Sequence, residues 1–149
     1  MTKIKWNKRF DYPKSMRSMI EGKRHYDINK NNKKLPSVTT ILGQTQSKEK
    51  QDSLARWRDK VGVNEATRIT DTAAARGTAM HNILEAYVNG TKRVDLTELG
   101  KQATTMASLI IEKGLTNRLT EVWGNEVTLY YPDLYAGATD LVGIYDGVE

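Results

Sequence analysis

Apolar residues in the middle of the chain recur at helical spacing. Leu54, Trp57 and Val61 fall at i, i+3 and i+7, which indicates an amphipathic helix with Trp57 in the core. A second stripe has the same period: Leu99, Ala103, Met106 and Ile110. The pattern predicts helices over residues 38–42, 53–61, 64–87 and 98–113, of which the third runs with little or no break through an alanine-rich stretch.

Capping residues and glycines predict where these helices begin and end. Serine, threonine and aspartate side chains accept hydrogen bonds from the free N–H groups of a first helical turn, and glycine readily ends a helix. The expected N-caps are Ser37, Asp52 or Ser53, and Thr97. The expected stops are Gly43, Gly62 and Gly114.

After residue 114 the period changes from 3.6 to 2. Residues 119–123 and 126–131 are expected to be extended, Pro132-Asp133 to turn the chain, and residues 135–145 to form the next strand. Asp146-Gly147 is a strong two-residue hairpin signal, so Val148 is expected to begin another strand. The predicted fold class is mixed α and β (α+β), with helices first and an antiparallel hairpin after them.

Positive charge is concentrated at the N-terminus. Residues 1–34 contain eleven Lys or Arg against three acids, whereas the whole 149-residue chain has a net charge of only +5. Aromatic side chains and a histidine are interleaved with these cations: Trp6, Phe10, Tyr12, His25 and Tyr26. Such a segment suits a polyanion with phosphates and base faces, and an ordinary solvated arm is the open alternative. A short strand or hairpin is possible within it, followed by a polar loop over residues 29–34.

Composition excludes several classes of protein. The longest apolar runs are far shorter than the roughly 20 residues of a membrane span, and the N-terminus lacks the apolar region of a signal peptide. We therefore expect an intracellular, cytoplasmic protein. The chain has no cysteine, which excludes disulfides, cysteine-bound zinc and thiol nucleophiles.

His81 and Glu85 are four residues apart in the third helix and should lie on one face, beside an apolar stripe that can pack. An imidazole and a carboxylate so placed could bind a divalent metal ion. Gly77 would let a backbone or a phosphate approach where the part of this helix that holds His81 and Glu85 begins. A solvated pair of side chains on an exposed helix is the alternative.

Asp140 occupies an apolar row of the last strand. Its same-face neighbours would be Ala136, Ala138, Val142 and Ile144. A carboxylate buried in such a row is costly unless a cation or hydrogen-bond donors compensate it, which indicates a functional site. A capping or solvent-facing role at a glycine kink is the alternative.

Three ordered motifs resemble those of the RecB-like branch of the PD-(D/E)xK nuclease superfamily, which includes phage exonucleases and the mitochondrial genome maintenance exonuclease. The motifs are Leu35-Pro36-Ser37-Val38-Thr39-Thr40-Ile41-Leu42, Arg76-Gly77-Thr78-x-x-His81-x-x-x-Glu85 and Tyr135-Ala136-Gly137-Ala138-Thr139-Asp140. The resemblance implies a restriction-endonuclease-like core over residues 35–149, after a basic segment over residues 1–34. It also implies a metal-dependent DNA exonuclease of phage replication, recombination or repair.

The resemblance also assigns roles to residues. It implies His81 and Asp140 as ligands of Mg²⁺ or Mn²⁺, with Glu85 and Asp140 as the catalytic carboxylates. Contacts to DNA are expected from four positions: Ser37, Thr39, Arg76 and Gly77. The substrate that the resemblance implies is DNA that is single-stranded or has a free end.

The family also has a strand with an (Asp/Glu)-x-Lys pair, and the sequence ends before it. A continuation or a partner chain is expected to supply that strand, and this chain alone is expected to cut slowly or not at all. A nucleic-acid-binding protein without turnover is therefore the second hypothesis. A hydrolase with another metal is weaker, since only two histidines exist and His-Glu-x-x-His is absent.

Overall fold

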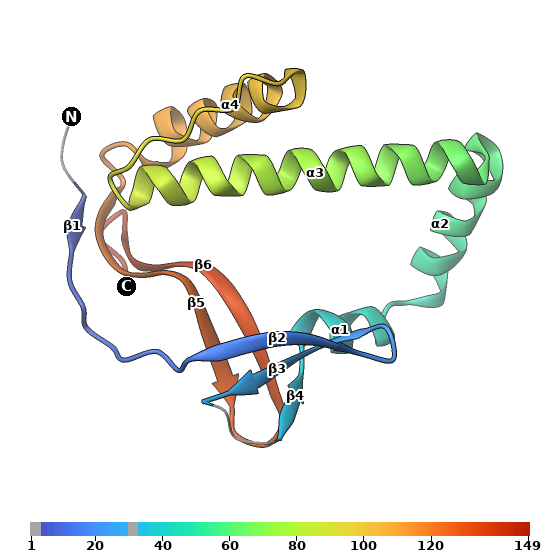
Figure 1. Ribbon diagram of the computed structural model, residues 1–149, viewed down its shortest axis with the longest axis horizontal. Helices are drawn as coiled ribbons and strands as arrows, with labels where there is room; N and C mark the ends of the chain where they lie inside the picture. Colours follow the sequence, from blue (N-terminus) through green and yellow to red (C-terminus); the bar gives the residue numbers. More distant parts are fainter. Residues whose placement is uncertain (1–3, 30–32) are drawn as a thin grey trace.

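The computed structural model describes residues 4–29 and 33–149, and within them it is a mixed α+β protein (Figure 1). Its helices are α1 (Val38–Gln44), α2 (Lys48–Val61), α3 (Val63–Val88) and α4 (Glu98–Ile110), the last continued by a π-helical turn, η1 (Ile111–Leu115). One sheet has the order β1 (Lys5–Trp6), β5 (Leu119–Tyr131), β6 (Tyr135–Tyr145). The other has the order β2 (Ser15–Ile20), β3 (Lys23–Ile28), β4 (Lys34–Pro36). None of the described helices combines the length and apolar character that crossing a membrane requires.

The predicted helices are present, with corrections at their boundaries. Ser37 caps α1 and Thr97 caps α4 through their side-chain oxygens, and Gly62, at φ 87°, separates α2 from α3. The cap of α2 is Ser47 rather than Asp52 or Ser53. The predicted start was too late, because the first turns of α2 are polar and carry no apolar period. Gly43 lies inside α1 and Gly114 inside η1, so neither glycine ends a helix where expected.

Helix α3 is a single 26-residue rod that runs along one side of the molecule (Figure 1). Its main neighbour is α4, whose fully buried residues are Ala103 and Ala107. Small side chains on this face let two helices approach closely, whereas Met106 and Ile110 of the predicted stripe remain exposed. Trp57 is only half-buried and α2 has no buried residue, so the prediction that Trp57 lies in the core is also wrong.

Strands β5 and β6 form the long antiparallel hairpin that the period-2 pattern predicts. Their register runs from Tyr131↔Tyr135 at the turn to Leu119↔Tyr145 at the far end, with two slips that bend the ribbon. Gly143 lies at one slip, where a Cβ atom would collide with the carbonyl oxygen of Glu121. Beyond β6, Asp146 and Gly147 have positive φ as the hairpin signal requires, and Val148 pairs back with Tyr145.

The described part of the basic segment, residues 4–29 and 33–34, contributes strands to a sheet with the residues that follow it. Strands β2 and β3 form the hairpin that the sequence allows within residues 1–34, and β3 pairs with β4 through Tyr26↔Leu35. Tyr26, Ile28 and Leu35 bury themselves against Ala136 of β6. The β2–β3–β4 sheet therefore crosses the predicted boundary between residues 34 and 35, and that boundary stays a prediction. Of the polar loop, residues 30–32 lie outside the described ranges.

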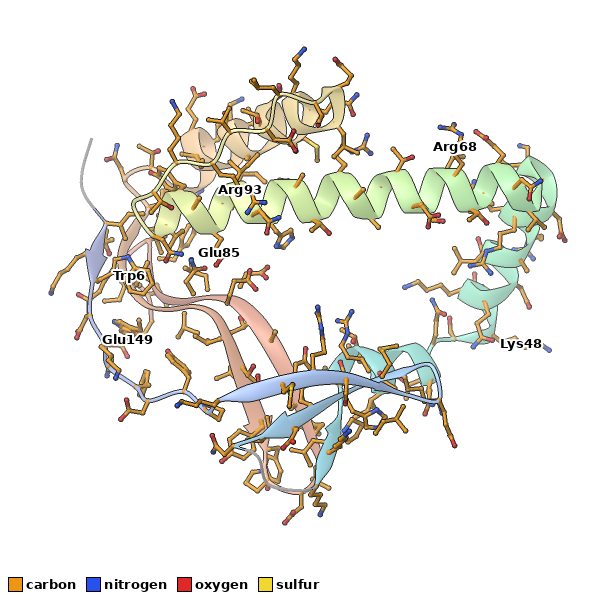
Figure 2. All side chains as sticks on the ribbon, viewed as in Figure 1. Trp6, Lys48, Arg68, Glu85, Arg93 and Glu149 are labelled. Carbon is orange, nitrogen blue, oxygen red and sulfur yellow. The ribbon has the colours of Figure 1, made fainter. Side chains whose placement is uncertain are left out.

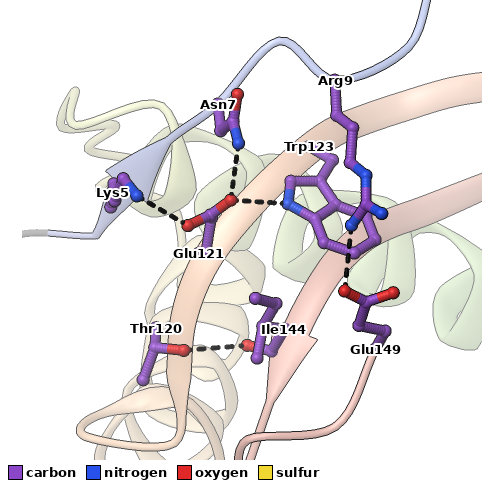
Figure 3. Close-up of polar contacts among 8 residues, drawn as sticks. All are labelled: Lys5, Asn7, Arg9, Thr120, Glu121, Trp123, Ile144 and Glu149. Atoms are coloured by element: carbon purple, nitrogen blue, oxygen red, sulfur yellow. Dashed lines mark hydrogen bonds and ion pairs between the residues drawn. The ribbon is translucent and has the colours of Figure 1, made fainter.

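A second core joins the N-terminus to β5. Val88, Leu119 and Val122 are buried together, and β1 pairs in parallel with β5 beside them. Around Glu121, the ammonium of Lys5 lies 3.0 Å away, and Asn7 Nδ2 and Trp123 Nε1 each donate a hydrogen bond at 2.8 Å (Figure 3). These hydrogen bonds and the lysine charge lower the pKa of Glu121 to about 2.

Several N-terminal aromatic side chains take part in packing contacts, and a base-stacking role for them stays a prediction. Trp6 Nε1 donates to the carbonyl of Val88 at 2.9 Å, and Phe10 meets the Trp123 ring edge-on at 5.9 Å. Tyr26 is buried in the first core. Trp6 and Phe10 nevertheless remain 47% exposed, whereas Tyr26 is buried. The sequence pattern could not predict this difference, because the packing partners are far away in the chain.

Candidate metal centre

His81, Glu126 and Asp140 meet at one place in the structure. The Nδ1 atom of His81 lies 3.5 Å from Oδ1 of Asp140, and one ligand atom from each of the three residues lies within 4.8 Å of the others. The expected proximity of His81 and Asp140 is therefore present, although its role in binding metal stays a prediction. Glu126 is a third member that the sequence reasoning missed.

Two elements bring these side chains together. His81 belongs to the C-terminal part of α3, which lies beside β5. Glu126 and Asp140 belong to the β5–β6 hairpin, where the pairs Asn125↔Leu141 and Val127↔Thr139 flank them. Residues that face each other between such pairs project to the same side of a sheet, so the two carboxylates are neighbours across the strands. The Pro132-Asp133 turn signal, extended by this pairing rule, would have found Glu126.

The cluster is electrostatically unbalanced. Partial loss of hydration raises the pKa of Glu126, and the negative charges of Asp140 and Glu85 raise it further, while His81 opposes them. Two adjacent carboxylates disfavour each other's ionised form, and a cation between them would remove that repulsion. Imidazole nitrogen and carboxylate oxygen together suit Mn²⁺ well and leave Mg²⁺ acceptable. The three residues therefore fit a divalent ion by the chemistry of their donors.

The backbone at Glu126 is unusual. Its φ is 52°, in the left-handed region, although it lies within a strand and is not a glycine. Non-glycine residues in that region are strained, and such strain is found at functional sites more often than elsewhere. Here the strain coincides with one of the three residues of the cluster.

Asp140 is not buried, which corrects the argument made from its apolar row. Its side chain is 69% exposed, and that of His81 is 49% exposed. The alternation places Asp140 on the same face as Ala136, but the β2–β3–β4 sheet covers that face only around Ala136. Burial of Asp140 therefore does not argue for a bound cation. The mutual repulsion of the Asp140 and Glu126 carboxylates does argue for one.

Glu85 lies nearby without joining the three. It helps to line a cavity of about 160 Å³ together with His81, Glu126 and Asp140, on the side of α3 that faces the hairpin (Figure 2). Its backbone carbonyl accepts a hydrogen bond from Asn125 Nδ2 at 3.3 Å, which ties the helix to β5. The position suits the supporting carboxylate that the family resemblance implies, and this role stays a prediction.

Of the four expected DNA contacts, Ser37 and Thr39 line a hollow that Glu126 and Asp140 also line, whereas Arg76 and Gly77 line neither this hollow nor the smaller cavity, and their role in binding DNA stays a prediction. Ser37 is 1% exposed, and its hydroxyl is engaged with the Thr39 amide and hydroxyl. Arg76 Nη1 donates to Gln102 Oε1 of α4 at 3.4 Å, so it points away from the cluster. Gly77 lies inside the long α3 rather than near its start, with open space where a Cβ would be.

A larger hollow of about 610 Å³ adjoins the cluster and contains Thr39. Glu126 and Asp140 line both the hollow and the smaller cavity, so the two spaces share a wall. Arg17 of β2 and Arg24 of β3 line the other side of the hollow. The charge count of residues 1–34 indicated a polyanion, but only the hairpin register shows which arginines share a face.

Comparisons with protein-family models, curated proteins and solved structures gave no match to this chain.

Proposed function

We propose that this chain is a metal-dependent DNA nuclease with a restriction-endonuclease-like core. Its proposed substrate is DNA that is single-stranded or has a free end. One observation carries the proposal: His81, Glu126 and Asp140 converge from α3 and the β5–β6 hairpin beside a hollow that contains two arginines. The motif resemblance suggests the reaction class, and the chemistry of the three clustered side chains supports it.

The proposed roles follow from the chemistry of each side chain. Asp140, Glu126 and the imidazole of His81 would hold Mg²⁺ or Mn²⁺, with Glu85 as a supporting carboxylate at the edge of the same cavity. When bound, the ion polarises a phosphodiester and lowers the pKa of its water. The exposure of Asp140 leaves room for a phosphate to approach from the hollow. The raised pKa of Glu126 reflects in part the repulsion by Asp140 and Glu85, which a bound cation would relieve.

A protein that binds nucleic acid on this scaffold without cleaving it is the second candidate. The family's site includes a lysine that orients the nucleophile, and within the described residues neither the cavity nor the hollow is lined by lysine. This observation favours binding without turnover, and it leaves the proposed metal centre unchanged.

The test measures metal binding and cleavage separately. Mn²⁺ affinity is measured by calorimetry, and cleavage is followed on end-labelled single-stranded DNA with Mg²⁺ or Mn²⁺. Asp140→Asn and Glu126→Gln are compared with Asp133→Asn, an acid at the turn of the same hairpin that pairs with Lys33. Loss of a partner that only orients a metal ligand costs about 10- to 100-fold. We expect the two cluster variants to lose at least that much metal affinity and the control to keep it.

Three outcomes are distinct. Cleavage that is lost with metal binding in Asp140→Asn and retained in Asp133→Asn supports the nuclease. Metal binding that depends on the cluster without any cleavage supports the second candidate. Equal Mn²⁺ affinity in all variants would mean that these residues do not form a metal centre.

A further inference from the structure

We propose that the 610 Å³ hollow is a binding groove for one strand of nucleic acid, in which Arg17 and Arg24 hold phosphates and Tyr130 stacks on a base. This inference rests on the proposed function, because it assigns the polynucleotide subsite next to the metal centre. It also names single-stranded substrate as the form that the site accepts.

The two arginines share one face of the β2–β3 hairpin. Arg17 lies opposite Tyr26, and Arg24 lies opposite Met19, so all four side chains alternate to the same side. Tyr26 fixes this face against β6 through the buried cluster with Ala136. The hairpin face therefore continues from a packed core into the wall of the hollow.

Neither guanidinium is neutralised within the protein. Among residues 4–29 and 33–149, the side chains of Arg17 and Arg24 have no acidic partner and no hydrogen-bond acceptor, whereas Arg9, Arg68 and Arg118 are each paired with an acid. The backbone at Arg24 is held, since its carbonyl accepts from Ser37 N at 2.9 Å and from Thr40 Oγ1 at 3.2 Å. Two unpaired cations on a fixed backbone suit an anionic ligand.

The wall opposite the arginines leads to the metal centre. Glu126 and Tyr130 are four residues apart on β5 and therefore project to the same side, about 13 Å apart along the strand. The Tyr130 side chain lines the hollow and is 44% exposed, so its ring offers a face to a ligand. Tyr131 and Tyr135 already stack on each other at 5.9 Å, which leaves Tyr130 as the better platform for a base.

Size favours one strand over two. A volume of about 610 Å³ is in the range of pockets that enclose ligands of roughly 300–1,000 Å³, which suits a short piece of one strand. Aromatic stacking also needs an unpaired base, because a base within a duplex is already covered by its neighbours. Phosphates on the arginines and a base on Tyr130 would leave the strand running towards Glu126 and Asp140.

The first experiment measures binding without metal, so that it does not depend on the metal centre. The affinity of a fluorescein-labelled oligothymidylate is measured by anisotropy in EDTA over a range of salt concentrations. Each phosphate contact on a single strand contributes about 0.7 to the slope of log affinity against log salt. We expect Arg17→Gln with Arg24→Gln to lower the slope by about 1.4 and to weaken binding roughly 25-fold at 0.1 M salt.

The matched control changes the same charge elsewhere. Arg56→Gln with Arg58→Gln removes two exposed arginines of α2, which do not line the hollow. We expect this pair to bind like the wild type. An unchanged slope in the Arg17/Arg24 pair, an equal loss in the control pair, or a wild type that does not bind the oligonucleotide would overturn the proposal.

The stacking contact has its own test. Tyr130→Ala should weaken binding by roughly 5- to 150-fold, which is the usual cost of losing one stacked base, and Tyr130→Phe should retain it. If a variant does not fold by circular dichroism, photocrosslinking of the wild type to a 5-iodouracil oligonucleotide decides: a crosslink at Tyr130 supports the groove, and crosslinks only outside it contradict it. Tighter binding to a blunt duplex would contradict the choice of one strand, and an oligoribonucleotide of equal length tests whether the sugar matters.

The two proposals fail in different ways. Loss of metal binding by Asp140→Asn together with normal salt slopes in the arginine pair would remove the groove and leave the metal centre. Altered slopes in the arginine pair, with metal affinity that is unaffected by Asp140→Asn, would remove the nuclease and leave a single-strand-binding surface.

Discussion

The two sheets of this protein differ in how they are anchored and in the charge they present. The β1–β5–β6 sheet is anchored at one end by α3 and by the Glu121 contacts, and it presents the carboxylates of Glu126 and Asp140. The β2–β3–β4 sheet rests on β6 through a small buried cluster and on β5 through the hydrogen bond between the hydroxyls of Ser15 and Thr128, and it presents Arg17 and Arg24. Ligands for a cation and partners for an anion therefore come from separate sheets. Their alignment depends on these contacts between the two sheets, of which the cluster around Tyr26 is one.

The largest expected effect comes from breaking that cluster. Tyr26→Ala removes a buried ring, and truncations of this kind cost about 3–5 kcal/mol, so we expect the free energy of unfolding to fall by about 3 kcal/mol. Because the ring holds β3 against β6, the salt dependence of DNA binding should weaken while Mn²⁺ binding persists. Urea denaturation and the two binding assays measure these effects.

Met19→Ala is the matched control on the same face of the same sheet. Its side chain is 64% exposed, so the free energy of unfolding should change by no more than about 0.5 kcal/mol. If Tyr26→Ala is as mild as Met19→Ala, the small cluster is not what joins the two sheets.

A smaller effect of opposite sign is expected at Gly77, which touches neither sheet. The helix interior there has room for a Cβ atom, and alanine is favoured over glycine by about 0.8–1.0 kcal/mol in such a position. Gly77→Ala should therefore stabilise the protein by about 1 kcal/mol in urea denaturation, without changing DNA affinity. A loss of DNA affinity would restore the family-based expectation that a phosphate approaches Gly77.

Local sequence signals predicted the elements better than they predicted the packing. Caps at Ser37 and Thr97 and the turns at Asp133 and Gly147 depend on neighbouring residues, so the sequence could predict them. The polar start of α2 gave no apolar period, and its cap was therefore predicted too late. The face of α4 was misjudged because burial depends on α3, whose position no local pattern encodes.

Residue spacing and motifs predicted part of the candidate site, and strand pairing was needed for the rest. The spacing of His81 and Glu85 and the motif around Asp140 identified two of the three clustered residues. Predicting Glu126 requires the register of the β5–β6 hairpin, which places Glu126 opposite Asp140. The Pro132-Asp133 turn implies this register, but no signal near Glu126 itself does. Arg17 and Arg24 required the docking of one sheet on another, and that arrangement depends on the buried contacts of Tyr26 rather than on sequence near the arginines.

The smallest effect concerns the anchoring of the first sheet and is confined to acid. The pKa of Glu121 is lowered from 4.5 to about 2 by Asn7, Trp123 and Lys5. Its contacts therefore stabilise the folded state above pH 4.5, and this contribution is lost as the pH falls from 4.5 towards 2. Glu121→Gln should reduce the loss of stability over that range, measured by urea denaturation at a series of pH values.

Glu49→Gln, at an exposed acid of α2, is the control for this comparison. It should leave the pH dependence as it is in the wild type. Equal pH dependence in the wild type and in Glu121→Gln would show that the contacts of Figure 3 do not hold β1 in place.

The parallel pairing of β1 with β5 also bears on the order in which a ribosome delivers the parts of this fold. Asn7 and Glu121, which are hydrogen-bonded to each other, are separated by 114 positions in the chain. At a synthesis rate of roughly 5–20 residues per second, the first strand waits about 6 to 23 seconds for its partner. During that time the indole of Trp6, whose acceptor is the carbonyl of Val88, and the unpaired edge of β1 are open to other chains. Strand β1 is therefore among the last parts of the molecule to pair, because β5 is synthesised after the helices.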